Sequence, residues 1–220
     1  MVAETQRGKF ITLEGGEGTG KSTQVQRLTA FLGEHGLVVV GTREPGGSPG
    51  AEEIRRLLVE GEPGRWTPLT EALLHSAARA DHIARLIEPA LAEGRWVVSD
   101  RFSDSTLAYQ GFGHELGLDM VTKLNSMTSG GLCPDLTIIL DIPVGDGLRR
   151  AELRAGNGMG AAREDRYERM DVAFHERLRA GFLEIAQNEP ERCVVIDARA
   201  AIDEVANAIR EALTDRLPLP

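Results

Sequence analysis

Short apolar runs alternate with longer amphipathic segments along the chain. Continuous apolar and β-branched runs predict five buried strands, at Phe10–Leu13, Leu37–Gly41, Trp96–Asp100, Leu136–Pro143 and Cys193–Ala198. Apolar residues at helical spacing predict helices at Lys21–His35, Glu52–Leu58, Glu71–Leu91 and Ile202–Leu213. Buried strands separated by helices are typical of a parallel sheet covered on both faces. The pattern therefore predicts one α/β domain over residues 1–220. Its three layers are a five-stranded parallel sheet and the helices that cover each face of the sheet.

The longest predicted helix, Glu71–Leu91, carries an apolar stripe whose role the pattern leaves open. Its members are Leu73, Ala77, Ala80, Ala84, Ile87 and Leu91. Such a stripe packs either against the core or against a second subunit. Both alternatives stand at this point.

Composition narrows the class of protein. The hydrophobic content of 41% supports a sizeable core, and the formal net charge of -9 argues against non-specific nucleic-acid binding and polybasic membrane contact. The opening MVAETQRGKF lacks the apolar segment of a secretory signal, and no apolar run approaches the roughly 20 residues that span a bilayer. Cys133 and Cys193 lack metal-ligand spacing, which predicts reduced, mostly buried thiols in a cytoplasmic protein. Any anionic ligand must therefore be attracted by a local cluster of Arg and Lys.

The segment FITLEGGEGTGKSTQ joins the first predicted strand to the first predicted helix. It matches the P-loop pattern of Gly, four residues and Gly-Lys-Ser, in which backbone N–H groups and a helix N-terminus bind phosphate. Lys21 is expected to reach the β- and γ-phosphates of ATP, and Ser22 to bind Mg²⁺. The predicted nucleotide-binding residues are Gly15, Gly16, Glu17, Gly18, Thr19, Gly20, Lys21, Ser22 and Thr23. Together with the strand pattern, this loop predicts a P-loop NTPase fold.

Two further strand ends place charged residues on the same rim of the sheet. Arg43 follows the second strand, and Asp100 and Arg101 end the third. Asp100 is expected to hold Mg²⁺ together with Ser22. Arg43 and Arg101 are expected to form a second phosphate site facing the loop, because arginine binds phosphate in a bidentate manner. Glu17 is expected to face this second ligand, since a carboxylate repels phosphate.

The segment of residues 149–169, RRAELRAGNGMGAAREDRYER, differs in composition from the rest. Arginines flank a Gly/Ala-rich middle, which is typical of a mobile lid. Arg154, Arg163 and Arg166 are the candidates for neutralising charge on a transferring phosphoryl group. The alternative is a solvated helix whose arginines pair with neighbouring acids.

Two phosphate sites favour phosphoryl transfer over a nucleotide-dependent switch. Neither Asn-Lys-x-Asp nor Asp-x-x-Gly of the GTPases occurs, and Gly16 stands where a partitioning ATPase usually has a lysine. A switch also gives no reason for a second arginine-lined anion site. Phosphoryl transfer between two bound phosphorylated molecules is therefore the favoured reaction, with Lys21, Arg101 and the lid arginines as its catalytic residues.

Several segments, in order along nearly the whole chain, resemble bacterial thymidylate kinases. They are the P-loop segment, TREPGG, EALLHSAARADHI, VVSDRFSDSTLAYQG and PDLTIILD. The resemblance implies transfer of the ATP γ-phosphate to dTMP with Mg²⁺, and a homodimer. It also implies that Arg43 and Arg101 hold the dTMP phosphate, that Glu44 and Arg55 line the acceptor site, and that Glu17 interacts with the sugar 3′-hydroxyl or its water.

The resemblance also implies contacts to the base and the sugar. Arg79 would hydrogen-bond a thymine carbonyl, and Ser105 and Thr106 would meet the polar edge of the base, with Gln110 close by. Tyr109 would lie under the deoxyribose, where it would crowd a 2′-hydroxyl.

His75 departs from the family pattern, which usually has a stacking phenylalanine there. An imidazole ring also stacks on a base, but it is smaller and titratable. His75 is then a tolerated variant, a weaker base contact, or a group whose protonation near pH 6–7 lowers affinity.

Overall fold

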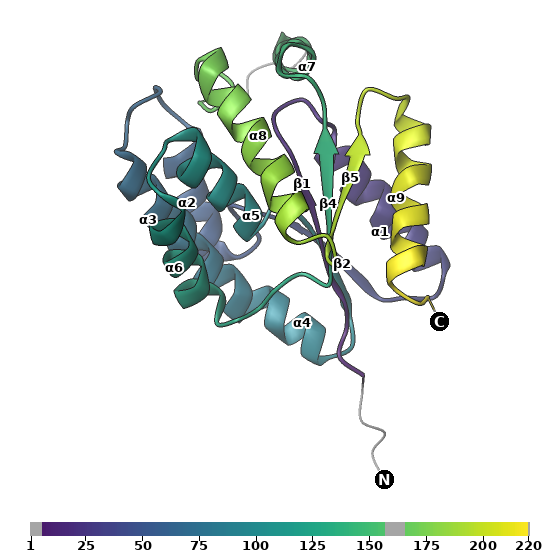
Figure 1. The fold of residues 1–220 in the computed structure, drawn as a ribbon. Coiled ribbons are helices and arrows are strands. Elements are labelled where there is room, and N and C mark those ends of the chain that lie inside the picture. Colours follow the sequence, from purple (N-terminus) through teal and green to yellow (C-terminus); the bar gives the residue numbers. More distant parts are fainter. Residues whose placement is uncertain (1–5, 157–165, 220) are drawn as a thin grey trace.

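The computed structural model of the chain describes residues 6–156 and 166–219. Five parallel strands form one sheet in the order β2-β3-β1-β4-β5 (Figure 1). The strands are β1 (Phe10–Glu14), β2 (Val39–Arg43), β3 (Trp96–Asp100), β4 (Leu136–Asp141) and β5 (Cys193–Asp197). The predicted five-stranded parallel sheet is therefore confirmed. The second strand begins two residues later than predicted. It is half-exposed rather than buried, because it is an edge strand paired with β3 alone.

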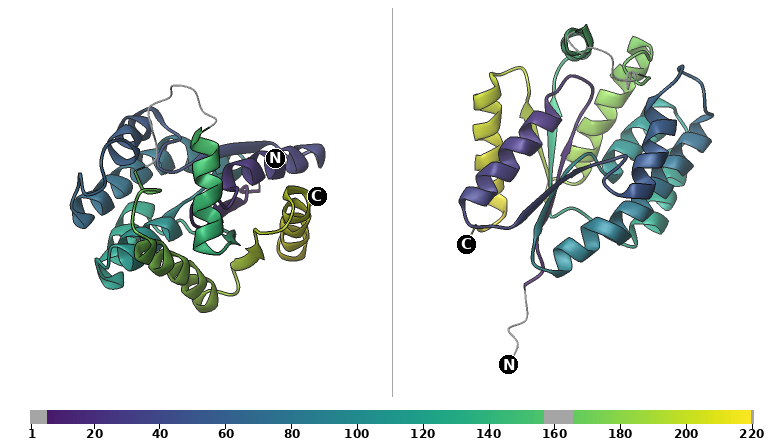
Figure 2. Two further views of the ribbon diagram at one scale, coloured as in Figure 1. Left: turned by 90° about the horizontal axis from the view of Figure 1, so that it is seen from above. Right: turned by 180° about the vertical axis from the view of Figure 1, so that it is seen from behind.

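Helices cover both faces of the sheet. One face packs on α1 and α9 through Leu28, Leu32 and Ile209, and the other packs on α4 and α8 (Figures 1 and 2). The helices are α1 (Lys21–Glu34), α2 (Pro49–Val59), α3 (Pro68–His82), α4 (Glu88–Ala92), α5 (Ser103–Thr106), α6 (Leu118–Ser129), α7 (Val144–Gly156), α8 (Val172–Asn188) and α9 (Ile202–Arg216). Two π-helical turns, 83–87 and 107–113, extend α3 and α5.

Side-chain caps fix where several helices begin. Ser48 Oγ accepts the backbone N–H of Ala51, and Asp171 Oδ1 accepts that of Phe174 at 2.6 Å. Pro49 and Pro68 occupy the first turns of α2 and α3, where a missing N–H costs nothing. The Ser48 cap therefore starts α2 within the loop that follows β2.

The long predicted helix is continuous, but it presents its apolar stripe to solvent. Residues 68–92 are helical through α3, a π-helical turn and α4. Leu73 is 49% exposed, and Ala77, Ala80 and Ala84 are exposed as well, whereas Ile87 belongs to the core. Most of the stripe therefore does not pack against the core of this subunit.

Parallel pairing places the ends of β1, β2 and β3 at one rim of the sheet. Leu13 and Arg43 both pair in register with Asp100. Helix α7 crosses above this rim (Figure 2). Both cysteines are free thiols, Cys193 buried and Cys133 exposed, so the prediction of burial was wrong for Cys133. In the described part of the chain, no helix is long and apolar enough to cross a membrane.

Candidate active site

The glycine-rich loop of residues 15–20 connects β1 directly to α1, as the P-loop pattern predicts. Gly18 has φ of 68°, and a Cβ there would lie 1.9 Å from the carbonyl oxygen of Gly147 in α7. Any side chain would therefore be strained and would collide with backbone. Gly20 caps α1 in a left-handed conformation. The loop thus presents main chain and a helix N-terminus at the rim, which is the geometry of a phosphate site.

Lys21 begins α1 and bends back over this loop. Its Nζ donates to the Gly16 carbonyl at 2.7 Å and to Thr19 Oγ1 at 3.1 Å. Burial, and then the positive charge of Arg101, lower the pKa of Lys21 to about 8, so the ammonium form still predominates at pH 7. Thr23 lies exposed in the first turn of α1. A cation is thus held at the loop where a triphosphate would bind.

Ser22 and Asp100 offer two hard oxygen donors beside the loop. Ser22 Oγ donates to Asp100 Oδ2 at 2.5 Å. Among residues 6–156 and 166–219, no cluster of three or more His, Cys, Asp or Glu could hold a metal ion alone. One carboxylate and one hydroxyl fit Mg²⁺ bound mainly by phosphate and water, and do not fit a metal held by protein ligands alone.

Arg101 connects the phosphate loop to a neighbouring cavity. Its Nη1 donates to the Gly15 carbonyl at 2.9 Å, and its Nη2 donates to Glu17 Oε1 at 3.1 Å and to Tyr109 OH at 2.8 Å. Tyr109 OH also makes a short hydrogen bond to Glu17. Burial alone would raise the pKa of Glu17, but Arg101 and Lys21 lower it to about 2. Glu17 is therefore an ionised group between the loop and the cavity.

A cavity open to solvent lies beyond Arg101. It brings together ten of the eleven residues predicted to bind the acceptor. They are Glu17, Glu44, Arg55, His75, Arg79, Arg101, Ser105, Thr106, Tyr109 and Gln110. These residues come from four separate segments of the chain and line the same cavity. Their individual roles remain predictions.

Arg43 is the predicted acceptor residue that does not line the cavity. Its Nη2 donates to Glu52 Oε2 at 3.0 Å, and both side chains are largely exposed. Arg43 and Arg101 therefore do not meet at one phosphate site in this structure, because Arg43 pairs with Glu52 on α2. An exposed pair of this kind contributes about 0–1 kcal/mol, so it is easily exchanged.

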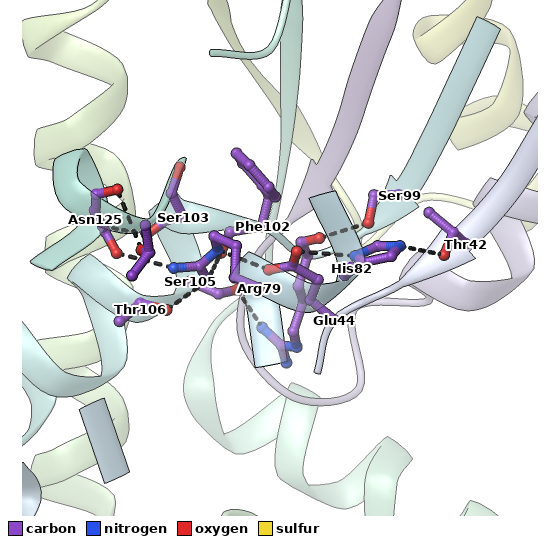
Figure 3. A network of polar contacts seen from close by, with 12 residues as sticks. Thr42, Glu44, Arg79, His82, Ser99, Phe102, Ser103, Ser105, Thr106 and Asn125 are labelled. Carbon is purple, nitrogen blue, oxygen red and sulfur yellow. Dashed lines mark hydrogen bonds and ion pairs between the residues drawn. The ribbon is translucent and has the colours of Figure 1, made fainter. Parts of the chain in front are cut away.

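Arg79 and Glu44 form the core of a buried polar network at the base of the cavity (Figure 3). Arg79 Nε donates to Glu44 Oε2 at 2.8 Å, and its other nitrogens donate to Asn125 Oδ1, the Phe102 carbonyl and Thr106 Oγ1. A guanidinium has five N–H groups, and these bonds use four. At most one N–H remains for a bound base.

His82 completes this network behind Glu44. Its Nδ1 lies 3.0 Å from Glu44 Oε1, and its Nε2 lies 2.8 Å from Thr42 Oγ1 (Figure 3). Both Glu44 oxygens therefore have protein partners. Glu44 lines the cavity as predicted, but it acts on Arg79 rather than offering a free carboxylate.

His75 meets Tyr167, a residue that sequence reasoning did not assign. His75 Nε2 lies 3.0 Å from Tyr167 OH, and Tyr167 OH donates to Glu71 Oε2 at 2.9 Å. Burial, and then Arg79, lower the pKa of His75 to about 3. In this structure burial and the nearby cation oppose a charged ring, which argues against the alternative in which His75 protonates near pH 6–7.

The three predicted lid arginines have different positions. Arg154, in the last turn of α7, is exposed, and its Nη2 donates to Glu168 Oε1 at 2.5 Å at the cavity wall. Arg163 lies outside the described residues. Arg166 is buried, and it donates to Glu71 Oε1 at 2.6 Å and to the Leu58 carbonyl at 2.7 Å. Arg166 therefore anchors this segment to α3, and the prediction that it faces the phosphates is not met in this structure.

Two buried carboxylates at the site were missed from the sequence. Glu71 sits on the buried side of α3, where burial raises its pKa, but the nearby His114 and the hydrogen bond from Arg166 lower it to about 2. Glu14 ends β1 and accepts hydrogen bonds from the segment after β3. A charged residue within an apolar pattern was the available signal, because such a residue requires buried partners.

Comparison with known proteins places this site in a family. The family model for thymidylate kinase matches residues 13–209. A thymidylate kinase of Caulobacter vibrioides is 54% identical over 213 residues, which are 97% of this chain and 99% of its own. One from Rhizorhabdus wittichii is 53% identical, covering 96% of this chain and 99% of its own.

A solved structure gives the same assignment. The crystal structure of thymidylate kinase from Ehrlichia chaffeensis superposes with a TM-score of 0.76 at 33% identity, covering 94% of this chain and 99% of that chain. The family match over residues 13–209 includes the phosphate loop and the residues that line the cavity. The chain belongs to the thymidylate kinase family.

Proposed function

We propose that this chain transfers the γ-phosphate of ATP to dTMP, giving dTDP. One observation carries the proposal: Arg101 spans the donor and acceptor sites, with one nitrogen on the Gly15 carbonyl and the other beside Glu17 and Tyr109. Two anion sites that share one guanidinium suit direct transfer between two bound nucleotides. Family membership over nearly the whole chain supports the same reaction.

On the donor side, the loop of residues 15–23 binds the ATP phosphates, and Lys21 neutralises charge on the transferring group. Ser22 and Asp100 would hold Mg²⁺, which would supply positive charge to offset that of the phosphates. Arg101 and Arg154 are the described arginines proposed to act on the phosphoryl group, and Arg163 is proposed with them from sequence alone.

On the acceptor side, Arg101 and Arg43 bind the dTMP phosphate. Arg43 does so after leaving Glu52, an exchange that an exposed ion pair permits at little cost. Glu17 orients the 3′-hydroxyl, and Arg55 closes the wall through its bond to the Pro45 carbonyl at 2.8 Å.

The base lies between His75 and the Arg79 network. Arg79 uses its remaining N–H on a thymine carbonyl, while Ser105, Thr106 and Gln110 meet the polar edge. Gln110 Oε1 is buried without a hydrogen-bond partner in the described structure, so it can accept a ring N–H. Tyr109 lies under the sugar.

The exposed stripe on α3 supports the proposal of a homodimer. Leu69 and Leu73 are 43% and 49% exposed, and Ala77, Ala80 and Ala84 continue the line at helical spacing. A stripe of small and apolar side chains suits helix packing against a second copy of α3. We also place the reaction in the cytoplasm, where ATP is available.

An acceptor panel tests the proposed reaction. Turnover with ATP is measured for dTMP, dUMP, AMP, GMP and CMP on the wild type and on Arg79→Ala. Arg85→Ala is the matched control, because Arg85 is an exposed arginine on the same helical segment, paired with Asp81. We expect dTMP to be preferred, and Arg79→Ala to lose dTMP turnover while retaining ATP binding. Turnover of AMP or GMP with dTMP inert would exclude the proposal.

A further inference from the structure

The buried carboxylate of Glu14 lies beneath the segment that carries Arg101. Glu14 is the last residue of β1 and is 0% exposed. Its Oε1 accepts the backbone N–H of Phe102 at 2.7 Å, and its Oε2 lies 2.5 Å from Ser105 Oγ. Both partners belong to the segment after β3, and Figure 3 shows them beside the Arg79 network. No role given above uses this carboxylate.

The backbone at Arg101 requires such support. Its φ of 72° lies in the left-handed region, which is sparsely populated by residues other than glycine. A residue persists there when the surrounding structure fixes it, and such residues cluster at functional sites. The Arg101 N–H donates to the Leu13 carbonyl at 3.0 Å, and Glu14 accepts the next N–H, that of Phe102. Strand β1 therefore holds both peptide groups that flank the left-handed residue.

Ser105 links Glu14 to the Arg101 side chain and to the cavity. Arg101 Nη1 donates to Ser105 Oγ at 3.0 Å, and Ser105 lines the cavity. A hydroxyl has one proton to donate and two positions that accept, whereas a guanidinium only donates. If Glu14 is ionised, the Ser105 proton is donated to the carboxylate. If Glu14 is neutral, it donates to Ser105, and the hydroxyl proton is available to a ligand.

We infer that Glu14 is a positioning residue of the acceptor site, which holds the left-handed turn at Arg101 and, in its neutral form, frees the Ser105 proton for an oxygen of the acceptor nucleotide. The inference rests on the proposed function and deepens its acceptor site. Phosphate and pyrimidine carbonyl oxygens only accept hydrogen bonds, so a donating hydroxyl favours them over an amino group at the same place.

The charges around Glu14 agree with this assignment. Burial, and then the Asp104 carboxylate, raise the pKa of Glu14 to about 8, although Ser105 and Arg101 oppose the rise. Lys21 and the Cys193 thiol also interact with Glu14 electrostatically. The neutral acid thus predominates at pH 7 and ionises as the pH rises through about 8.

The test compares Glu14→Gln, Glu14→Leu and a control, Thr12→Val. Thr12 lies two residues earlier in β1 and is also fully buried, but it bonds Thr137 on β4 rather than the segment after β3. The dissociation constant of dTMP is measured by calorimetry between pH 6.5 and pH 9.5 without ATP, so that Lys21 at the triphosphate site does not enter. Turnover at pH 7 is measured separately, and wild-type turnover of dTMP establishes the proposed function independently.

At pH 7, Glu14→Gln should bind dTMP within about threefold of the wild type, because its amide always donates to Ser105. Glu14→Leu should bind dTMP at least about tenfold more weakly, with Thr12→Val unchanged. From pH 7 to pH 9, wild-type affinity should fall about tenfold and that of Glu14→Gln should stay level. Equal pH curves for the wild type and Glu14→Gln would overturn the inference, and this comparison decides alone if Glu14→Leu does not fold.

Discussion

A single methyl group added at Gly147, in α7, should displace the glycine-rich loop of residues 15–20 and lower activity. Gly147 lies in the first turn of α7, and a Cβ there would be 2.5 Å from the carbonyl oxygen of Glu17. Gly18 makes the reciprocal contact, since a Cβ on Gly18 would lie 1.9 Å from the carbonyl oxygen of Gly147. The loop and the helix that crosses it are therefore in backbone contact, with no flexible side chain to absorb a change.

The size of the effect follows from this contact. Carbon and oxygen atoms that are not bonded rarely approach closer than roughly 3.0–3.4 Å, so Gly147→Ala must move the loop or α7 by about 0.5–0.9 Å. A displacement near 1 Å at a reacting centre costs up to about 10²-fold in rate. We expect kcat to fall by about 10- to 100-fold, and the KM for ATP to rise, because Glu17 belongs to the glycine-rich loop that is proposed to bind the triphosphate.

Gly145→Ala is the matched control in the same helical turn. A Cβ at Gly145 would meet nothing within 4 Å. Both substitutions replace glycine in a helix by a better helix former, which stabilises by up to about 1 kcal/mol. Gly145→Ala should therefore keep wild-type kcat and unfold at an equal or higher urea concentration. If kcat and the KM for ATP of Gly147→Ala agree within twofold with those of Gly145→Ala, the backbone contact does not set the loop conformation.

The remaining predictions concern burial and charge. The pKa of His75 is lowered to about 3, so folding opposes protonation of the ring, and stability is lost as the pH falls from about 6.5 toward 3. Between pH 7 and pH 4.5, His75→Phe should therefore lose less free energy of unfolding than the wild type, as measured by urea titration. Glu71→Gln should lose about 3–5 kcal/mol of unfolding free energy, because it leaves Arg166 buried and unpaired, whereas Glu62→Gln, in an exposed pair, should lose less than about 1 kcal/mol. Leu73→Glu should convert the proposed dimer to a monomer in light scattering, and the equally exposed Ile202→Glu on α9 should not; a wild-type monomer would refute the interface.

The strands and the rim were predictable because both depend on local sequence. A strand buried on both faces is a continuous apolar run, and parallel topology then places every strand end at one edge. The P-loop was predictable because its glycines meet a backbone requirement, as Gly18 does against α7. Helix α8 and the π-helical turns were not predicted, although Phe174, Leu178 and Ile185 of α8 lie at helical spacing in the sequence.

Partner choice among charged residues was the part that sequence could not supply. Arg43 and Arg101 both follow strand ends, yet Arg101 turns to the loop and Arg43 to Glu52. Arg166 appeared to be a lid cation, but Glu71 holds it in the interior. Ion pairing depends on which opposite charge lies within about 4 Å, and that distance is a property of the folded chain.

A chain with a net charge of -9 is expected to repel anionic ligands. The way its acids pair with its arginines explains how it can still bind them. A buried pair such as Glu44 and Arg79 costs about 3–5 kcal/mol to break, so Arg79 keeps its geometry whether or not a ligand is bound. An exposed pair such as Glu52 and Arg43 costs about 0–1 kcal/mol, so Arg43 is free to exchange a carboxylate for a phosphate. The buried acids therefore fix the shape of the site, while the exposed acids hold arginines that a phosphate can recruit. An acidic protein can bind two phosphorylated substrates in this way because its acids neutralise the arginines that shape the cavity and leave the exposed ones for the ligand.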